Sequence, residues 1–125
     1  MLDATRPRRA PNDELRQGPE PERAVRCGAC DATIARLGDR TVIGPSDLHT
    51  FVNPRGEVFE LVCFAKAEGA AALGRGTLEF TWFPGHAWRF AICRACGVQL
   101  GWHYEGPTRF WGLDRARLRW PTQDS

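Results

Sequence analysis

The chain has 125 residues, of which 42% are hydrophobic and 26% charged, and its net charge is +2 at pH 7. These values are typical of one globular domain, and so small a net charge gives no reason to expect a nucleic-acid partner. No run of residues approaches the roughly 18 apolar residues of a membrane span. The composition therefore excludes a membrane protein with apolar helices and favours a soluble one.

Residues 1–24 have a composition that predicts a disordered N-terminal tail. Four of the nine prolines lie in this segment, together with charges of both signs and almost no large apolar side chains. Such a segment cannot bury enough apolar surface to offset the entropy lost on ordering. It also lacks the apolar stretch of a signal peptide, so we expect a cytoplasmic protein whose thiols stay reduced.

From Val25 onward the pattern predicts an all-β domain, because short apolar runs alternate with glycine- and proline-containing turns about every 8–12 residues. Residues 53–56, with the sequence Asn-Pro-Arg-Gly, predict a β-turn between two strands. Residues 59–64 predict a buried strand inside the sheet. Residues 65–73 fit either a loop or a helical turn, and residues 113–118 fit either a short helix or a strand.

Four of the five cysteines form two Cys-x-x-Cys pairs, Cys27 with Cys30 and Cys93 with Cys96. Each pair places two thiolates on one tight turn, and two such turns supply the four sulfurs of a tetrahedral zinc site. We predict one structural zinc ion that joins the two ends of the domain and has no open position for catalysis. Two redox dithiols or four buried free thiols remain as alternatives.

The fifth cysteine, Cys63, lies between Val62 and Phe64 in an apolar stretch. We interpret it as a buried free thiol that behaves as a small hydrophobic residue. A catalytic thiol needs a base or a positive charge that lowers its pKa, and none lies close in the sequence. His49 and His86 are interpreted as exposed or structural residues, with no catalytic role.

Tryptophans gather around turns and short strands in the second half of the chain. Trp82 and Trp88 flank a Phe-Pro-Gly-His turn, and Trp102 and Tyr104 alternate around His103, so that on a strand they share one face. Because tryptophan is seldom fully buried, we predict that three indoles and a phenol form a partly open box. Such a box accepts a flat or cationic group, although ordinary core packing remains an alternative.

The order of these motifs resembles the thalidomide-binding domain family of cereblon, the CULT domain, in its free-standing bacterial form. The resemblance covers residues 25–119 and leaves 120–125 as a short C-terminal tail. It implies two antiparallel sheets joined at an angle and pinned by a structural zinc ion, the β-tent. The matching pieces are the two cysteine pairs, residues 53–56, residues 82–88, the Leu-Gly-Trp-His-Tyr of residues 100–104 and the Phe-Trp-Gly-Leu of residues 110–113.

The resemblance implies a small-molecule binding module rather than an enzyme. Its ligands would be cyclic imides of the glutarimide or thalidomide type, uracil- or uridine-like rings, or peptide ends that carry a cyclic imide. Three tryptophans would form the walls, a tyrosine would form the floor, and the imide would bond to backbone groups of Phe80 and Trp82. The ligand-binding residues implied in this way are Asn53, Pro54, Phe80, Trp82, Trp88, Trp102 and Tyr104.

The sequence departs from the vertebrate pattern at two of these positions. Phe80 replaces a histidine, which a contact through the backbone carbonyl tolerates, and Tyr104 replaces a phenylalanine, whose new hydroxyl can add a hydrogen bond. The Lon-like and adaptor-binding regions of full cereblon are not in this sequence, so we expect no ubiquitin-ligase adaptor as a partner.

Two other functions fit the same fold. A methionine sulfoxide reductase of the B type would use a further cysteine as nucleophile, and Cys63 is the spare thiol, although its apolar setting argues against this role. A reader of methylammonium groups would use the same aromatic box through cation–π attraction. A carboxylate at the mouth would support that second function, and Glu79 and Glu105 are near in sequence.

Overall fold

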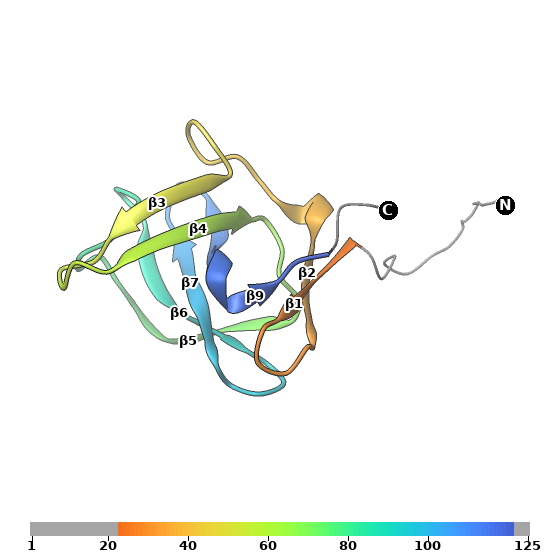
Figure 1. The fold of residues 1–125 in the computed structure, drawn as a ribbon. Helices are drawn as coiled ribbons and strands as arrows, with labels where there is room; N and C mark the ends of the chain where they lie inside the picture. Colours follow the sequence, from red (N-terminus) through yellow and green to blue (C-terminus); the bar gives the residue numbers. More distant parts are fainter. Residues whose placement is uncertain (1–22, 122–125) are drawn as a thin grey trace, which may run out of the picture.

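The computed structural model describes residues 23–121, which form two antiparallel sheets (Figure 1). This part of the chain contains no α-helix, and therefore no helix with the length and apolar character needed to cross a membrane. The prediction of an all-β domain with two antiparallel sheets is confirmed. The strands are β1 (Ala24–Cys27), β2 (Thr33–Arg36), β3 (Leu48–Val52), β4 (Val58–Phe64), β5 (Ala70–Thr77), β6 (Ala87–Cys93), β7 (Gln99–Glu105), β8 (Arg109–Asp114) and β9 (Leu118–Arg119).

The small sheet has the order β2-β1-β9 and joins the beginning of the domain to its end. A 3-10 turn, Arg115–Arg117, leads the chain from β8 in the large sheet to β9 in the small one (Figure 1). Asp114 caps this turn, because its carboxylate accepts a hydrogen bond of 3.0 Å from the Ala116 N–H. Residues 113–118 therefore contain the end of one strand, a short 3-10 turn and the start of another strand.

The large sheet has the order β3-β4-β8-β7-β6-β5, and its first hairpin turns at residues 53–56 as predicted. The Gly56 N–H bonds to the Asn53 carbonyl at 2.9 Å, and Gly56 has φ 88°, a conformation that glycine adopts without strain. The Asn53 side chain accepts further bonds from the backbone N–H groups of Arg55 and Glu57, each at 2.9 Å. This turn is therefore closed by side-chain bonds as well as by the backbone.

Residues 65–73 resolve into a loop, 65–69, and the first half of β5, which pairs with β6. The alanine-rich sequence favours a helix by propensity, but pairing with a neighbouring strand decides its conformation here. The register shifts between Leu73 and Thr77, and Gly74 has φ 83° at that irregularity. The strand bends at this point, next to the loop that carries the aromatic residues.

Two clusters of buried residues support the domain. The first includes Val25, Ile34, Phe64, Leu100 and Leu113 and holds the small sheet against the large one. The second consists of Leu61, Cys63, Phe83, Tyr104 and Phe110, and the predicted box residues pack against it.

The packing continues past residue 119, where the predicted domain ends. Trp120 lies against Phe64 with ring centroids 6.2 Å apart, and its indole N–H donates to the Arg115 carbonyl at 3.1 Å. At the other end, Ala24 is already a buried residue of β1, and the rest of the predicted N-terminal tail lies outside the described residues, apart from Arg23.

Gly69 lies where the loop before β5 crosses the small sheet. Its N–H donates to the Ile34 carbonyl, and its own carbonyl accepts from the Arg94 N–H, both at 2.9 Å. A Cβ atom at this position would lie 2.1 Å from the Thr33 carbonyl oxygen, which belongs to the backbone and cannot move aside alone.

We expect Gly69→Ala to lower the free energy of unfolding by about 1–3 kcal/mol, because the backbone must shift to admit a methyl group. Urea unfolding followed by circular dichroism measures this loss. Gly38→Ala is the matched control, because a Cβ there meets nothing within 4 Å. A Gly69→Ala protein as stable as Gly38→Ala would contradict the packing described here.

Candidate functional site

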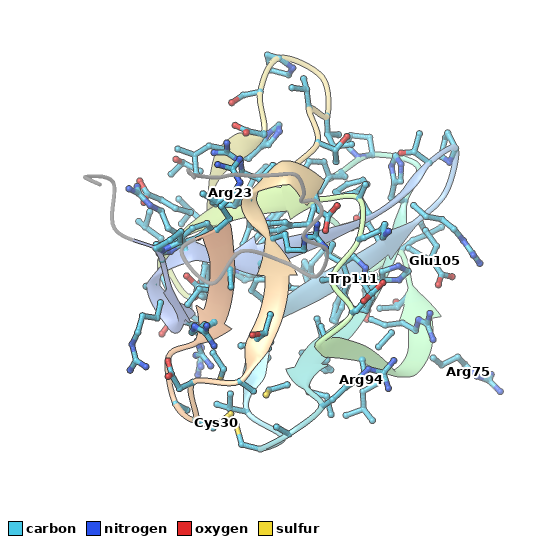
Figure 2. All side chains as sticks on the ribbon, turned by 90° about the vertical axis from the view of Figure 1, so that its right-hand side faces the viewer. Arg23, Cys30, Arg75, Arg94, Glu105 and Trp111 are labelled. Carbon is cyan, nitrogen blue, oxygen red and sulfur yellow. The ribbon has the colours of Figure 1, made fainter. Side chains whose placement is uncertain are left out.

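The two cysteine pairs meet where the small sheet adjoins the large sheet, near Cys30 in Figure 2. Cys27 ends β1 and Cys93 ends β6, and each begins the turn that carries the second cysteine of its pair. The four Sγ atoms lie within 4.8 Å of one another, with Cys27 to Cys96 at 3.8 Å and Cys30 to Cys93 at 3.7 Å. Metal–sulfur bonds of about 2.3 Å in a tetrahedron place sulfurs about 3.8 Å apart, so this cluster could hold a metal ion such as zinc.

The two cysteine turns have the same backbone hydrogen bonds. In the first, Asp31 N–H donates to the Cys27 carbonyl and Cys27 N–H to the Ala32 carbonyl. In the second, Gly97 N–H donates to the Cys93 carbonyl and Cys93 N–H to the carbonyl of the next residue, Val98. All four bonds are 2.8 Å long, and both turns pass through the left-handed region, with φ 69° at Asp31 and 83° at Gly97. The sulfurs are thus presented by two equivalent turns.

A cavity of about 180 Å³ lies at the other end of the large sheet from the cysteines, and we call its lining residues the aromatic cage. A cavity of about 150 Å³ in an apolar protein interior is enough to hold a benzene ring, so the cage has room for one six-membered ring. The structure brings together all seven residues that the resemblance implies and adds one more. The lining residues are Asn53, Pro54, Phe59, Phe80, Trp82, Trp88, Trp102 and Tyr104.

Three aromatic rings pack tightly along one side of the cage. Trp82 and Trp102 meet edge to face, with centroids 5.1 Å apart and an interplanar angle of 74°. Phe59 completes the group at 5.5 Å from Trp102 and 5.6 Å from Trp82. Sequence reasoning missed Phe59, although alternation along β4 places it on the same face as the buried Leu61 and Cys63.

Trp88 stands on β6 and is fixed by its own hydrogen bond. Its indole N–H donates to the Glu79 carbonyl at 2.7 Å, which ties the indole to the loop before β6. Trp88 is paired in register with Tyr104 on β7, and Tyr104 is almost fully buried beneath the cage. Burial raises the pKa of the Tyr104 phenol, with a smaller contribution from Cys63, so the hydroxyl stays protonated at neutral pH.

Phe83 holds the loop between β5 and β6 in place. This side chain is 6% exposed, and its ring lies 4.7 Å from Tyr104, 4.9 Å from Phe110 and 5.1 Å from Phe51. The Thr81 hydroxyl adds a hydrogen bond of 2.7 Å to the His86 carbonyl. The loop that carries Trp82 is therefore fixed from within.

The loop leaves polar backbone groups open beside the cage. Phe80 has φ 55°, unusual for a residue with a side chain, and its ring is 72% exposed. Within residues 23–121, neither the Phe80 carbonyl nor the Trp82 N–H has a hydrogen-bond partner. The hydroxyl of Tyr104 likewise has none among the described residues. A carbonyl acceptor, an N–H donor and a hydroxyl are thus available to a guest.

Among residues 23–121, no carboxylate lines the cage. Glu79 contributes its backbone carbonyl to Trp88, and its side chain is not part of the lining. Glu105, which is labelled in Figure 2, forms an ion pair with Arg89. Its carboxylate oxygen lies 3.3 Å from Nδ1 of His103. Neither acid therefore supplies the negative charge that a methylammonium ligand would need at the mouth.

Cys63, His49 and His86 are held by burial or by hydrogen bonds to neighbouring groups of the chain. Cys63 is fully buried, and burial, together with the charge of Asp47, raises the pKa of its thiol to about 12. The His49 ring lies 2.9 Å from the carbonyls of Ile43 and Ser46. His86 bonds to the Pro84 carbonyl and to the Thr108 hydroxyl, each at 3.1 Å.

His103 lies on the opposite face of β7 from Trp102 and Tyr104, and packs against Trp111 with ring centroids 4.3 Å apart. Burial lowers the pKa of His103, although the charge of Glu105 raises it, and Arg89 and Arg109 lower it further. In the unfolded chain a histidine has a pKa of about 6.5, whereas the pKa of His103 in the folded chain is lower. As the pH falls through about 6.5, the unfolded chain therefore takes up a proton at this residue before the folded chain does.

We expect the domain to lose stability as the pH falls through about 6.5, by at most about 1.4 kcal/mol per pH unit from this residue. Urea unfolding at a series of pH values between neutral and mildly acidic conditions measures the slope. His103→Gln should have a smaller slope over the same range, since it removes the titrating ring. Equal slopes in the two proteins would show that His103 does not contribute.

Comparison with known proteins gives one consistent relationship. No protein-family model matches the chain. Cereblon from Xenopus tropicalis is 39% identical over 85 residues, which is 63% of this chain and 19% of that protein. Cereblon from Danio rerio is 38% identical over 84 residues, which is 62% of this chain and 19% of that protein. Cereblon from Drosophila melanogaster is 26% identical over 102 residues, which is 74% of this chain and 17% of that protein. The chain thus spans about a fifth of the length of the curated relatives it matches.

Proposed function

We propose that this chain, which carries a cereblon-like CULT domain, is a binding module whose aromatic cage takes a neutral cyclic imide ring. The ring would be a glutarimide of the thalidomide type, a uracil or uridine base, or the cyclic imide at the end of a peptide. One observation carries the proposal. A single cavity with room for one six-membered ring has aromatic walls, and beside them lie the Phe80 carbonyl and the Trp82 N–H, which have no hydrogen-bond partner among the described residues.

The walls of the cage favour a flat, uncharged ring. Eight residues line the cavity and none of them is ionisable at neutral pH, since the Tyr104 phenol keeps its proton. A neutral ring stacked against indoles gains contact area without the cost of burying a charge. A quaternary ammonium would be attracted by the same rings, but none of the carboxylates in the described part of the chain lines the cavity to complement it.

The open edge of the loop fits the polar edge of an imide. An imide presents one N–H between two carbonyl oxygens, and every such group left unpaired in a dry site costs about 1–3 kcal/mol. The Phe80 carbonyl can accept from the imide N–H, and the Trp82 N–H can donate to one imide oxygen. The Tyr104 hydroxyl is a candidate donor on the floor of the cage, so it could serve the other oxygen.

We propose binding without chemical conversion. An enzyme of the sulfoxide reductase type would need a reactive thiolate, whereas the only cysteine outside the metal cluster is fully buried and has a raised pKa. The proposed partner is the imide ligand alone, and we propose binding neither to nucleic acid nor to a ubiquitin-ligase adaptor. A cytoplasmic site of action is proposed because the four clustered cysteines need reducing conditions to remain thiolates.

We expect Trp102→Ala to weaken binding of glutarimide or uridine by about 1–3 kcal/mol, because one stacking wall of the cage is lost. Titration of tryptophan fluorescence in the metal-loaded protein measures the affinity. Trp111→Phe is the matched control, since this tryptophan packs against His103 away from the cage. Equal affinity of Trp102→Ala and wild type would sink the proposed site, and loss of affinity in Trp111→Phe would point to a general defect.

We also propose that the four clustered cysteines bind zinc as a structural ion. Zinc in structural sites is commonly bound by four thiolates in a tetrahedron, and the four Sγ atoms here lie close enough together for that arrangement. Four protein ligands leave no coordination position for a substrate. The affinity of such sites, about 10–16 kcal/mol, is comparable to the whole stability of a domain, about 5–15 kcal/mol. The metal is therefore expected to decide whether the two sheets stay together.

Removal of the metal by a chelator, or by Cys30→Ser, should unfold the domain and abolish ring binding together. Native mass spectrometry and circular dichroism report metal content and folding on the same sample. Cys63→Ala is the matched control, because it removes the one thiol outside the cluster and should keep one zinc ion per chain. A folded, metal-free protein would contradict the assignment.

A further inference from the structure

A second cavity, of about 410 Å³, adjoins the aromatic cage, and the proposed ring-binding function does not use it. The two cavities share three lining residues, Asn53, Phe59 and Trp102. Phe59 and Trp102, whose rings meet edge to face at 5.5 Å, thus border both cavities. The cavities are neighbours, so a substituent on a ring held in the cage lies close to the second cavity.

The second cavity differs from the cage because charged side chains line it. Arg55 and Glu57 come from the hairpin turn after β3, and Asp114 and Arg117 come from the end of β8 and the 3-10 turn. Two positive and two negative groups give a net charge of zero. The lining also contains the half-exposed ring of Phe90, so that an apolar surface lies beside the charges.

The four charged groups are not equally free to bind a ligand. Arg117 is held by the Gln99 carbonyl at 2.9 Å and by Asp114 at 3.6 Å. Glu57 accepts a hydrogen bond of 2.7 Å from the neutral Asn53 amide, so its negative charge is not neutralised. Within residues 23–121, the Arg55 guanidinium has no hydrogen-bond or ion-pair partner. Arg55 and Glu57 therefore remain as one available cation and one available anion.

We infer that the second cavity is a subsite for the peptide chain that carries the cyclic imide, and that Arg55 and Glu57 select among its charged side chains. The inference rests on the proposed function, because it takes the imide ring to lie in the cage. A peptide backbone is neutral and offers both donors and acceptors, which suits a cavity with balanced charge. The phosphate of a nucleotide would instead require a surplus of positive charge, and the lining has none.

The expected selectivity is modest, because both side chains are exposed to solvent. An acidic residue before the imide should gain from Arg55, and a basic residue should gain from Glu57, each by about two- to five-fold in affinity. These gains should shrink at high salt, since ions screen exposed charges. The ring contacts in the apolar cage should depend on salt much less.

The test uses the metal-loaded full chain, uridine and uridine monophosphate as one pair of ligands, and four probes that share a glutarimide ring. The smallest probe is acetyl-aminoglutarimide, and the others place Ala-Ala, Ala-Glu or Ala-Lys between the acetyl group and the aminoglutarimide. Affinities are measured by calorimetry at low and high salt. The variants are Arg55→Gln and Glu57→Gln, the second of which keeps an oxygen acceptor for Asn53. Arg75→Gln is the control, because Arg75 is an exposed arginine on β5 that lies outside this cavity (Figure 2).

We expect the peptide probes to bind more tightly than acetyl-aminoglutarimide. Arg55→Gln should remove only the preference for Ala-Glu, Glu57→Gln should remove only the preference for Ala-Lys, and Arg75→Gln should change neither.

If acetyl-aminoglutarimide binds but the peptide probes bind no more tightly, and if neither variant changes their affinities, the subsite is wrong while the proposed function stands. If uridine monophosphate gains over uridine through Arg55 while the peptides gain nothing, the cavity takes a phosphate and the inference is overturned. If no probe binds, the proposed function itself fails.

Discussion

The four clustered cysteines form a joint between the two sheets, and the placement of the small sheet relies on it. The small sheet consists of strands of four, four and two residues, and so short a sheet is not stable alone. Its first strand ends at Cys27, where the first cysteine pair begins, and the second cysteine pair begins where β6 ends at Cys93. Since β6 also carries Trp88 at its other end, an ion at the joint would fix the strand that bears one wall of the cage.

The cage combines a rigid apolar frame with a polar edge that is left open. Phe83 packs against Tyr104 on the floor of the cage, and the hydrogen bond from Trp88 to the Glu79 carbonyl sets the position of the third indole. The same loop holds Phe80 in a left-handed conformation, which costs of order 1–3 kcal/mol for a residue with a side chain. The burial of Phe83 in the same loop contributes to offsetting this cost. Such a site is prepared before a ligand arrives, so little binding energy is lost in ordering it.

Local patterns in the sequence were sufficient for the cysteine cluster and for the four cage residues Trp82, Trp88, Trp102 and Tyr104. Asn53, Pro54 and Phe80 followed only from the resemblance to the CULT domain. The spacing within each cysteine pair and the alternation of Trp102 and Tyr104 are properties of a single turn and a single strand. Phe59 and the second cavity depend instead on how the β3–β4 hairpin is placed beside β8 and β7, which follows from pairings such as Cys63 with Gly112. Those pairings join residues far apart in sequence, so no local pattern reveals them. The same reason applies to residues 65–73, where pairing with β6 overrides helix propensity.

The cage is proposed to recognise an imide through both its flat face and its N–H. Calorimetric titration of the metal-loaded protein with glutarimide and with N-methylglutarimide separates these two contributions, because methylation keeps the ring and removes the donor. We expect saturable binding of glutarimide and an affinity for the methylated ring that is lower by about tenfold or more, since the Phe80 carbonyl then faces no donor. Equal affinity for the two rings would contradict recognition of the imide, and absence of binding by both would contradict the cage as a ring site.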